Sequence, residues 1–182
     1  RSFREPVMQI FRPYVDWVKS AAVLDDLRLG KQRVEAKQVL NVFLRKAGIL
    51  RDGLRGWLNH PIVLLYYNDG RPYVDDVVGM FTACVKEWMR RGKQSNINLD
   101  DIRHLLDQLE KTPGTPITRL HEIEYRRILL LKNPDHYIRT FTEEEVREVL
   151  ETEPVKISGI NSWIFDDMRL YRRLLKKIKS KL

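Results

Sequence analysis

The stretch DDLRLGKQRVEAKQVL, residues 25–40, decides the fold and carries the most informative cluster of polar side chains. Its apolar residues recur at helical spacing, which predicts a helix. An α-helix turns about 100° per residue, so four polar residues fall within an arc of roughly 100° on one side. These residues are Arg28, Lys31, Gln32 and Glu35. Because the helix is polar on two sides and apolar between them, one polar side is expected to face a cleft.

The carboxylate on this arc has two interpretations. Lys31 and Glu35 are four residues apart, so they can form a surface ion pair of about 0.3–0.5 kcal/mol. In the other interpretation Glu35 is a general acid/base, and an amine beside it attacks the C1′ atom of a nucleotide sugar while arginines hold phosphates. That chemistry needs no metal and no cofactor, and the sequence lacks metal-ligand spacing.

Composition indicates a basic globular protein. The chain has 182 residues and a net charge of +8, which favours anionic partners. Nucleic acid is the first candidate among such partners. The alternative is a basic protein without a polyanion partner. The single cysteine, Cys84, excludes a disulfide framework, and a reducing, cytoplasmic location is expected. No apolar run reaches membrane-spanning length, and residues 1–14 lack the apolar core of a signal peptide. No membrane and no obligate protein partner are expected.

Helical patterns continue along the whole chain and predict an all-α fold, compact and single-domain, with a C-terminal helical extension. The expected helices run from 16 or 20 to 47 and over 61–67, 72–92, 99–111, 119–132 and 142–151, with a last helix from about 162. Thr142 and Glu145 have capping-box spacing. The segment NPDHY, 133–137, is expected only to end a helix.

The last helix is basic and amphipathic, with Arg169, Arg172, Arg173, Lys176, Lys177 and Lys179 away from its apolar side. This pattern fits binding to phosphates, to an RNA helix or to a membrane surface. The ordinary alternative, which we favour, is a docked terminal helix with a solvated face that adds some affinity for DNA.

Four segments and one arginine resemble motifs of the pyrimidine-dimer DNA glycosylase/AP lyase family and follow the same order along the chain. This family includes a small helical bacteriophage enzyme and cellular relatives. In VLDDLRLGKQRVEAKQV, residues 23–39, the residues Leu24, Asp26, Leu29 and Glu35 match the motif that carries the family's catalytic Glu. The other matches are NHPIVLLYY (59–67), CVKEWMRRG (84–92), Arg126 and KNPDHYIRTF (132–141). The resemblance covers roughly 8–141, and implies a glycosylase-like helical domain there and an extension over 142–182.

The resemblance implies a DNA repair protein that cleaves an N-glycosyl bond and then acts as an AP lyase on damaged or abasic double-stranded DNA. It implies an amine nucleophile and acid/base catalysis by Glu35. The residues expected to contact DNA are Arg28, Gln32, Asn59, His60 and Arg126. The alternatives are a non-catalytic nucleic-acid-binding module with the same fold and, more distantly, a helical protein that binds a protein partner and whose charge is incidental.

The nucleophile is where the sequence departs from the family. The bacteriophage enzyme uses the α-amine exposed when its initiator Met is removed, but here the bulky Gln9 follows Met8, the expected start, and normally protects such a Met. Either an N-terminal amine is used after processing, or Lys31 supplies the amine. The ordinary role of Lys31 is a salt bridge or a phosphate contact.

Other positions on this helix also differ from the bacteriophage enzyme. Val34 and Gln38 stand where that enzyme has Arg, and Arg28 stands where it has His. Much of the phosphate-binding set is therefore different. For Asn59 and His60 the ordinary alternative is that one of them caps the helix that begins at residue 61.

Overall fold

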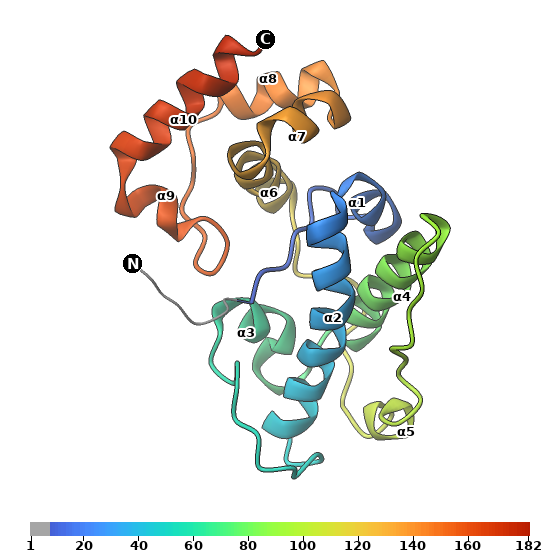
Figure 1. The fold of residues 1–182 in the computed structure, drawn as a ribbon. Helices are drawn as coiled ribbons and strands as arrows, with labels where there is room; N and C mark the ends of the chain where they lie inside the picture. The colour runs from blue at the N-terminus through green and yellow to red at the C-terminus, as the bar shows by residue number, and fades with distance from the viewer. Residues whose placement is uncertain (1–7) are drawn as a thin grey trace.

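The structure is a computed structural model, which describes residues 8–182. Ten α-helices, one short 3₁₀ helix and no strand make up this part of the chain, which confirms the all-α fold class (Figure 1). The α-helices are α1 (Trp17–Val23), α2 (Asp26–Lys46), α3 (Pro61–Tyr67), α4 (Val74–Arg90), α5 (Arg103–Leu106), α6 (Arg119–Lys132), α7 (Pro134–Thr140), α8 (Glu143–Glu151), α9 (Ser162–Asp166) and α10 (Met168–Ser180), and the 3₁₀ helix is η1 (Asn68–Gly70). Every helix within residues 8–182 is too short or too polar to cross a membrane.

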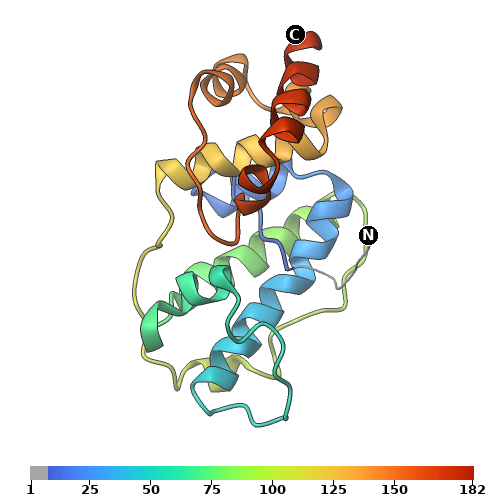
Figure 2. The same ribbon diagram turned by 90° about the vertical axis from the view of Figure 1, so that its left-hand side faces the viewer.

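Residues 8–12 form an extended N-terminal segment that runs between the helices rather than over them (Figures 1 and 2). An extended segment has no backbone hydrogen bonds of its own, so its buried N–H and C=O groups need partners elsewhere. Gln32 of α2 provides two of them. Its Oε1 atom accepts a hydrogen bond from the Phe11 N–H group at 2.7 Å, and its Nε2 atom donates to the Phe11 C=O group at 3.0 Å. The Gln32 side chain thus replaces the partner strand that a sheet would offer.

Arg12 ties the same segment to α4 through a buried ion pair. Its two terminal nitrogens lie 2.8 and 2.9 Å from the two carboxylate oxygens of Asp76, and the guanidinium also donates to the main chain of Val15. Val15 in turn donates its own N–H group to Glu122 of α6 at 2.6 Å. The N-terminal residues therefore join α2, α4 and α6 to one another.

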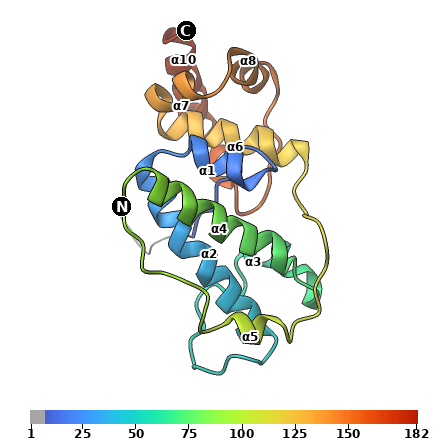
Figure 3. The same ribbon diagram turned by 90° about the vertical axis from the view of Figure 1, so that its right-hand side faces the viewer.

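Helix α2 packs mainly along α4, and α1 packs on α4 as well (Figure 3). Gly30 makes the close approach of α2 possible, because a Cβ atom at this position would lie 2.7 Å from the ring of Trp88 on α4. Residues such as Val39 and Leu40 point from α2 into the core and are fully buried. This packing fixes the position of α2, and with it the polar side chains that α2 carries.

The prediction of one helix from residue 16 or 20 to 47 is wrong, because the chain breaks between α1 and α2. Leu24 and Asp25 are extended, with ψ angles of 137° and 159°. The Tyr137 hydroxyl holds this break: it accepts the N–H group of Asp25 at 3.1 Å and donates to the Asp25 carboxylate. The partner lies 112 residues away, so the local pattern could not reveal the break.

Three further boundaries differ from the prediction. The helix expected over 99–111 is reduced to the single turn of α5. The last helix is divided into α9 and α10 at Asp167, whose side chain accepts the N–H group of Leu170 at 3.0 Å. The segment 133–137 does end α6 at Lys132, as predicted, but it also begins α7, with Asn133 as the N-cap and Pro134 in the first turn.

The C-terminal helices cover α6. The capping box of Thr142 and Glu145 is confirmed at the start of α8. Helices α8 and α10 both pack on α6, so residues 142–182 shield a helix that precedes them in the sequence. The division of the chain into 8–141 and 142–182 stays a prediction.

We expect Gln32→Ala to lower the free energy of unfolding by about 2–4 kcal/mol. The substitution leaves the N–H and C=O groups of Phe11 buried without partners, and each such group costs about 1–3 kcal/mol. Chemical denaturation measures this change. Gln38→Ala is the matched control, because Gln38 is an exposed glutamine on the same helix and should change stability by less than about 0.5 kcal/mol. Equal losses in the two variants would contradict the proposed role of Gln32.

Candidate active site

Helix α2 carries the polar arc, but its members differ sharply in exposure. Glu35 is 4% exposed and Gln32 is 1% exposed, whereas the side chain of Lys31 is 51% exposed. The buried part of the arc contacts the N-terminal segment, and Lys31 marks its open edge. The arc is therefore not a uniformly solvated helix face.

Glu35 has one oxygen that is hydrogen-bonded and one that is not. Its Oε2 atom accepts the main-chain N–H group of Gln9 at 2.9 Å. Its Oε1 atom lies 3.7 Å from Nζ of Lys31, which is an ion-pair distance but too long for a hydrogen bond. In the part of the chain that the structure describes, this buried Oε1 atom has no hydrogen-bond partner.

Burial raises the pKa of Glu35 to about 7, although the Gln9 N–H group and the charge of Lys31 both act to lower it. The physical cause is desolvation, which disfavours the charged form of a carboxyl group. A carboxyl group with a pKa near 7 is present in both protonation states at neutral pH. It can therefore give a proton in one step and take one in the next.

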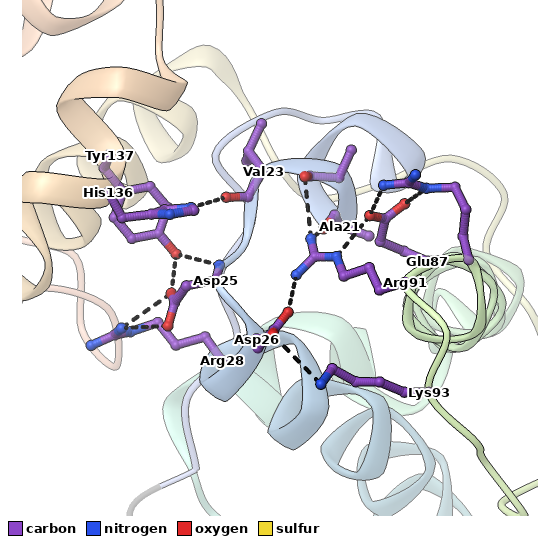
Figure 4. Close-up of polar contacts among 12 residues, drawn as sticks. Ala21, Val23, Asp25, Asp26, Arg28, Glu87, Arg91, Lys93, His136 and Tyr137 are labelled. Atoms are coloured by element: carbon purple, nitrogen blue, oxygen red, sulfur yellow. Dashed lines mark hydrogen bonds and ion pairs between the residues drawn. The ribbon is translucent and has the colours of Figure 1, made fainter.

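Arg28 is held at the start of α2 (Figure 4). Its Nη1 atom donates to both carboxylate oxygens of Asp25 at 3.1 Å each. Burial acts to raise the pKa of Asp25, but the hydrogen bond from Tyr137 and the charge of Arg28 outweigh it, and the pKa is lowered. The Asp25 carboxylate thus fixes Arg28 about two turns before Glu35 on the same side of α2.

Arg91, the C-cap residue of α4, holds the other side of the break between α1 and α2 (Figure 4). It pairs with Asp26 at 2.9 Å and donates to the carbonyl groups of Ala21 and Ala22 at 3.2 Å. A cavity of about 430 Å³ at this break is lined in part by Asp25, Arg91 and His136. These contacts make the start of α2 a rigid platform for Arg28.

Sequence reasoning missed Lys132 at the end of α6, which senses the charges of this arc, and Trp163 of α9, which lies against Lys132. The Nζ atom of Lys132 lies 5.6 Å from the centre of the Trp163 ring. Burial lowers the pKa of Lys132, and the positive charges of Arg28 and Lys31 lower it further. The cluster of cations around Glu35 therefore extends beyond α2. No local pattern could have revealed it, because Lys132 and Trp163 lie far from α2 in the sequence.

His60 and Asn59 lie at the start of α3. The Nδ1 atom of His60 accepts the N–H group of Ile62 at 3.2 Å, which confirms that His60 caps this helix. Burial also lowers the pKa of His60. Asn59 lines a cavity of about 460 Å³ together with residues of the loop over 48–58. Within residues 8–182 no hydrogen bond or ion pair joins either residue to Glu35, and their contacts with DNA stay predictions.

Arg126 supports the start of the described chain. Its Nε atom donates to the carbonyl group of Pro13 at 3.0 Å, and its Nη1 atom pairs with Glu148 at 3.3 Å. The guanidinium also lies 5.0 Å from the ring centre of Tyr14. These contacts are structural, as are those of Gln32, so DNA binding by either residue stays a prediction.

Residues 8–182 contain no group of three or more His, Cys, Asp or Glu side chains placed to hold a metal ion.

We expect the carboxyl carbon of Glu35 to titrate with a midpoint near pH 7 in a ¹³C NMR experiment, because its carboxylate is desolvated. A midpoint for Glu35 close to the ordinary glutamate value of about 4.3 would show that the carboxyl group is solvated and would contradict a buried acid/base at this position.

The same shift sets the pH dependence of stability. The folded-state pKa lies above the unfolded value, so this stabilising contribution is full below about pH 4 and is lost as the pH rises through 7. Glu35→Gln removes the titration. Between pH 5 and pH 8 the unfolding free energy of the unmodified chain should therefore fall by about 2–3 kcal/mol relative to that of Glu35→Gln. If the unfolding free energies of the two proteins change in parallel with pH, this expectation is wrong.

Comparison with known proteins identifies the family. A family model described as pyrimidine dimer DNA glycosylase matches residues 8–101, just over half of the 182 residues. Neither the curated proteins nor the solved structures contain a significant match. The match includes the N-terminal segment, α2 and α4, but ends before Arg126, Lys132 and Trp163. The chain belongs to the pyrimidine dimer DNA glycosylase family.

Proposed function

We propose that the chain is a DNA glycosylase with AP lyase activity, acting on damaged or abasic double-stranded DNA, in which Glu35 is the acid/base catalyst. The observation that carries the proposal is the state of this carboxyl group. One oxygen accepts a hydrogen bond from a main-chain nitrogen of the N-terminal segment. The other is ion-paired with Lys31 and has no hydrogen-bond partner among residues 8–182, and burial brings the pKa of the carboxyl group to about 7. Membership of the family supplies DNA as the substrate class.

The reaction runs through an amine. The nitrogen lone pair attacks C1′ of the deoxyribose, the N-glycosyl bond breaks, and the base leaves with a proton that protonated Glu35 can give. Opening of the sugar ring then leaves an imine between the amine and C1′. The carboxylate form of Glu35 can accept a proton from C2′, after which the 3′ phosphate leaves by β-elimination. Cations beside the carboxylate stabilise the phosphates in this sequence.

Among residues 8–182, two nitrogens lie close enough to Glu35 to be that amine. Nζ of Lys31 is 3.7 Å from Oε1 and is partly exposed. The main-chain nitrogen of Gln9 is 2.9 Å from Oε2. The Gln9 nitrogen becomes a reactive α-amine only in a chain that begins at this residue. We favour the Gln9 nitrogen, because it lies 2.9 Å from the nearer carboxylate oxygen whereas Nζ of Lys31 lies 3.7 Å from its own.

One observation favours a second function, that of a non-catalytic DNA-binding module. In a chain that continues before Gln9, the nitrogen nearest to Glu35 is an amide, and an amide nitrogen is not a nucleophile. The hydrogen bond between Glu35 and the N-terminal segment would then serve only the fold. The two functions differ in whether a covalent intermediate with DNA ever forms.

Borohydride trapping on duplex DNA with an abasic site separates these possibilities, because reduction of the imine leaves a stable protein–DNA adduct. The chains to compare begin at Arg1, at Met8 and at residue 9, the last carrying Gln9→Ala so that the α-amine is not lost by cyclisation of an N-terminal glutamine. We expect an adduct from the chain that begins at residue 9, and at least a hundredfold less adduct when Glu35→Gln is added.

Lys31→Ala in each of the three chains gives the control for the second amine. If Lys31→Ala abolishes the adduct in chains that otherwise form it, the nucleophile is Lys31. Peptide mapping of the reduced adduct identifies the modified nitrogen directly. If every chain binds duplex DNA but none forms an adduct or cleaves ultraviolet-irradiated DNA, the enzymatic proposal is wrong and the binding module is the function.

A further inference from the structure

We propose that α10 is a second DNA-binding element, which holds the phosphate backbone of the duplex outside the stretch engaged at Glu35. This inference rests on the proposed function only in taking DNA as the substrate; the glycosylase and lyase chemistry does not enter it. Helix α10 lies beyond the residues that the family model matches. Its surface would therefore be an addition made by this chain to the family's site.

The charge of α10 lies on one face. Six exposed cations cover an arc of roughly 160° on the helix, at 100° per residue. This basic face consists of Arg169, Arg172, Arg173, Lys176, Lys177 and Lys179. The opposite side carries the two residues of the helix that are fully buried, Tyr171 and Ile178. The helix itself, Met168–Ser180, contains no acidic residue.

Within residues 8–182 no ion pair neutralises this face, although Lys177 lies near enough to Asp135 for its charge to help lower the pKa of that carboxyl group. Among the ion pairs of residues 8–182, none includes a member of the basic face, and Lys181, which pairs with Asp135, lies just outside it. Like charges three or four residues apart on a helix repel each other, and Arg172 and Lys176 are such a pair. Arg169 also lies in the first turn, where the helix dipole disfavours a cation. Such an arrangement lowers the stability of the isolated helix, and a bound polyanion would reverse that effect.

A buried polar network fixes α10 in place. Arg127 of α6 donates to the hydroxyl group of Tyr171 at 2.7 Å and pairs with Glu124 at 2.9 Å. Glu124 also accepts a hydrogen bond from Asn161, next to α9, at 2.7 Å. All four side chains are buried. The basic face is therefore held on a rigid support, and little order has to be gained when it binds.

The residues next to this network also connect α10 with the candidate active site. Trp163 of α9, five residues before α10 begins, lies against Lys132, whose pKa responds to the charges of Arg28 and Lys31. Helices α9 and α10 and the start of the described chain all lie on the side shown in Figure 2. A duplex engaged at Glu35 would thus meet cations on α2, on α6 and on α10.

The charge pattern favours duplex DNA over a lipid surface. A helix that binds a membrane lays its apolar side into the lipid. Here the apolar side of α10 is buried against α6 and α9, and only the charged side is available. A row of phosphates needs no apolar contact, and each neutralised phosphate releases counterions. Binding to anionic vesicles remains a distinct outcome of the test.

The test replaces four cations of the basic face, Arg172, Arg173, Lys176 and Lys177, each by Gln. The full chain's affinity for undamaged duplex is measured over a range of salt concentrations. If two to four phosphate contacts are lost, the slope of log K against log[salt] should become shallower by about 2–4. Affinity at low salt should fall at least tenfold. Because these residues are exposed, the unfolding free energy should change by less than about 0.5 kcal/mol.

A second variant with the same change in net charge is the matched control. It carries Gln at four exposed cations on or near α4, η1 and α5, namely Arg71, Lys86, Arg103 and Lys111. The control should keep most of the slope. Equal losses in the two variants would mean that only net charge matters, and an unchanged slope in the α10 variant would mean that α10 does not touch DNA; either result overturns the proposal.

Two further measurements separate this proposal from others. Vesicles of phosphatidylserine that bind the unmodified chain but not the α10 variant, with DNA binding intact, would assign the face to membranes and overturn the proposal. Borohydride trapping on a short abasic duplex should be nearly unchanged in the α10 variant, whereas trapping on a long duplex should need more protein. If no chain forms an adduct but the salt slope still depends on α10, the glycosylase proposal fails and this inference stands.

Discussion

The fold depends on how the buried, extended N-terminal segment satisfies its polar groups. It has no strand beside it, so side chains of α2 take the place of a strand. Three residues along a helix advance about 4.5 Å and two residues along an extended chain about 6.6 Å. Gln32 and Glu35 are flexible enough to bridge that difference and meet the alternate residues Phe11 and Gln9. One turn of α2 thus sets the position and the register of the whole segment.

This arrangement gives Glu35 two roles that compete. As a hydrogen-bond acceptor for Gln9 it contributes to the fold, yet the burial needed for that contact destabilises its charged form and raises the pKa to about 7. Gln32, one helical turn before Glu35, shows that a neutral amide can also hydrogen-bond to the N-terminal segment. A carboxyl group at residue 35 therefore costs stability that a glutamine would not, and proton transfer is the property that only the carboxyl group offers.

The sequence predicted the helical class, most of the helices and the polar arc of α2, because these follow from local periodicity and capping. It missed the break at Asp25, which depends on Tyr137, and it missed Lys132, which senses the charges of the arc, with Trp163 against it. In each case the cause is a contact between residues far apart in the chain. The helical wheel placed Glu35 and Gln32 on one side correctly, but it could not tell a buried pair from a solvated face. That distinction depends on the N-terminal segment, which has no periodic pattern.

The contacts of residues 12–15 also have a consequence for the order of folding. Arg12 needs Asp76, Val15 needs Glu122, and the Tyr14 hydroxyl donates to Glu145 at 2.8 Å. The partner of Tyr14 is therefore synthesised 131 residues after it. Such long-range contacts form late, because loop closure comes before the contact is made. A nascent chain holds α2 and Glu35 well before it can complete the contacts of residues 12–15, and the last of these contacts forms only when synthesis has passed Glu145 of α8.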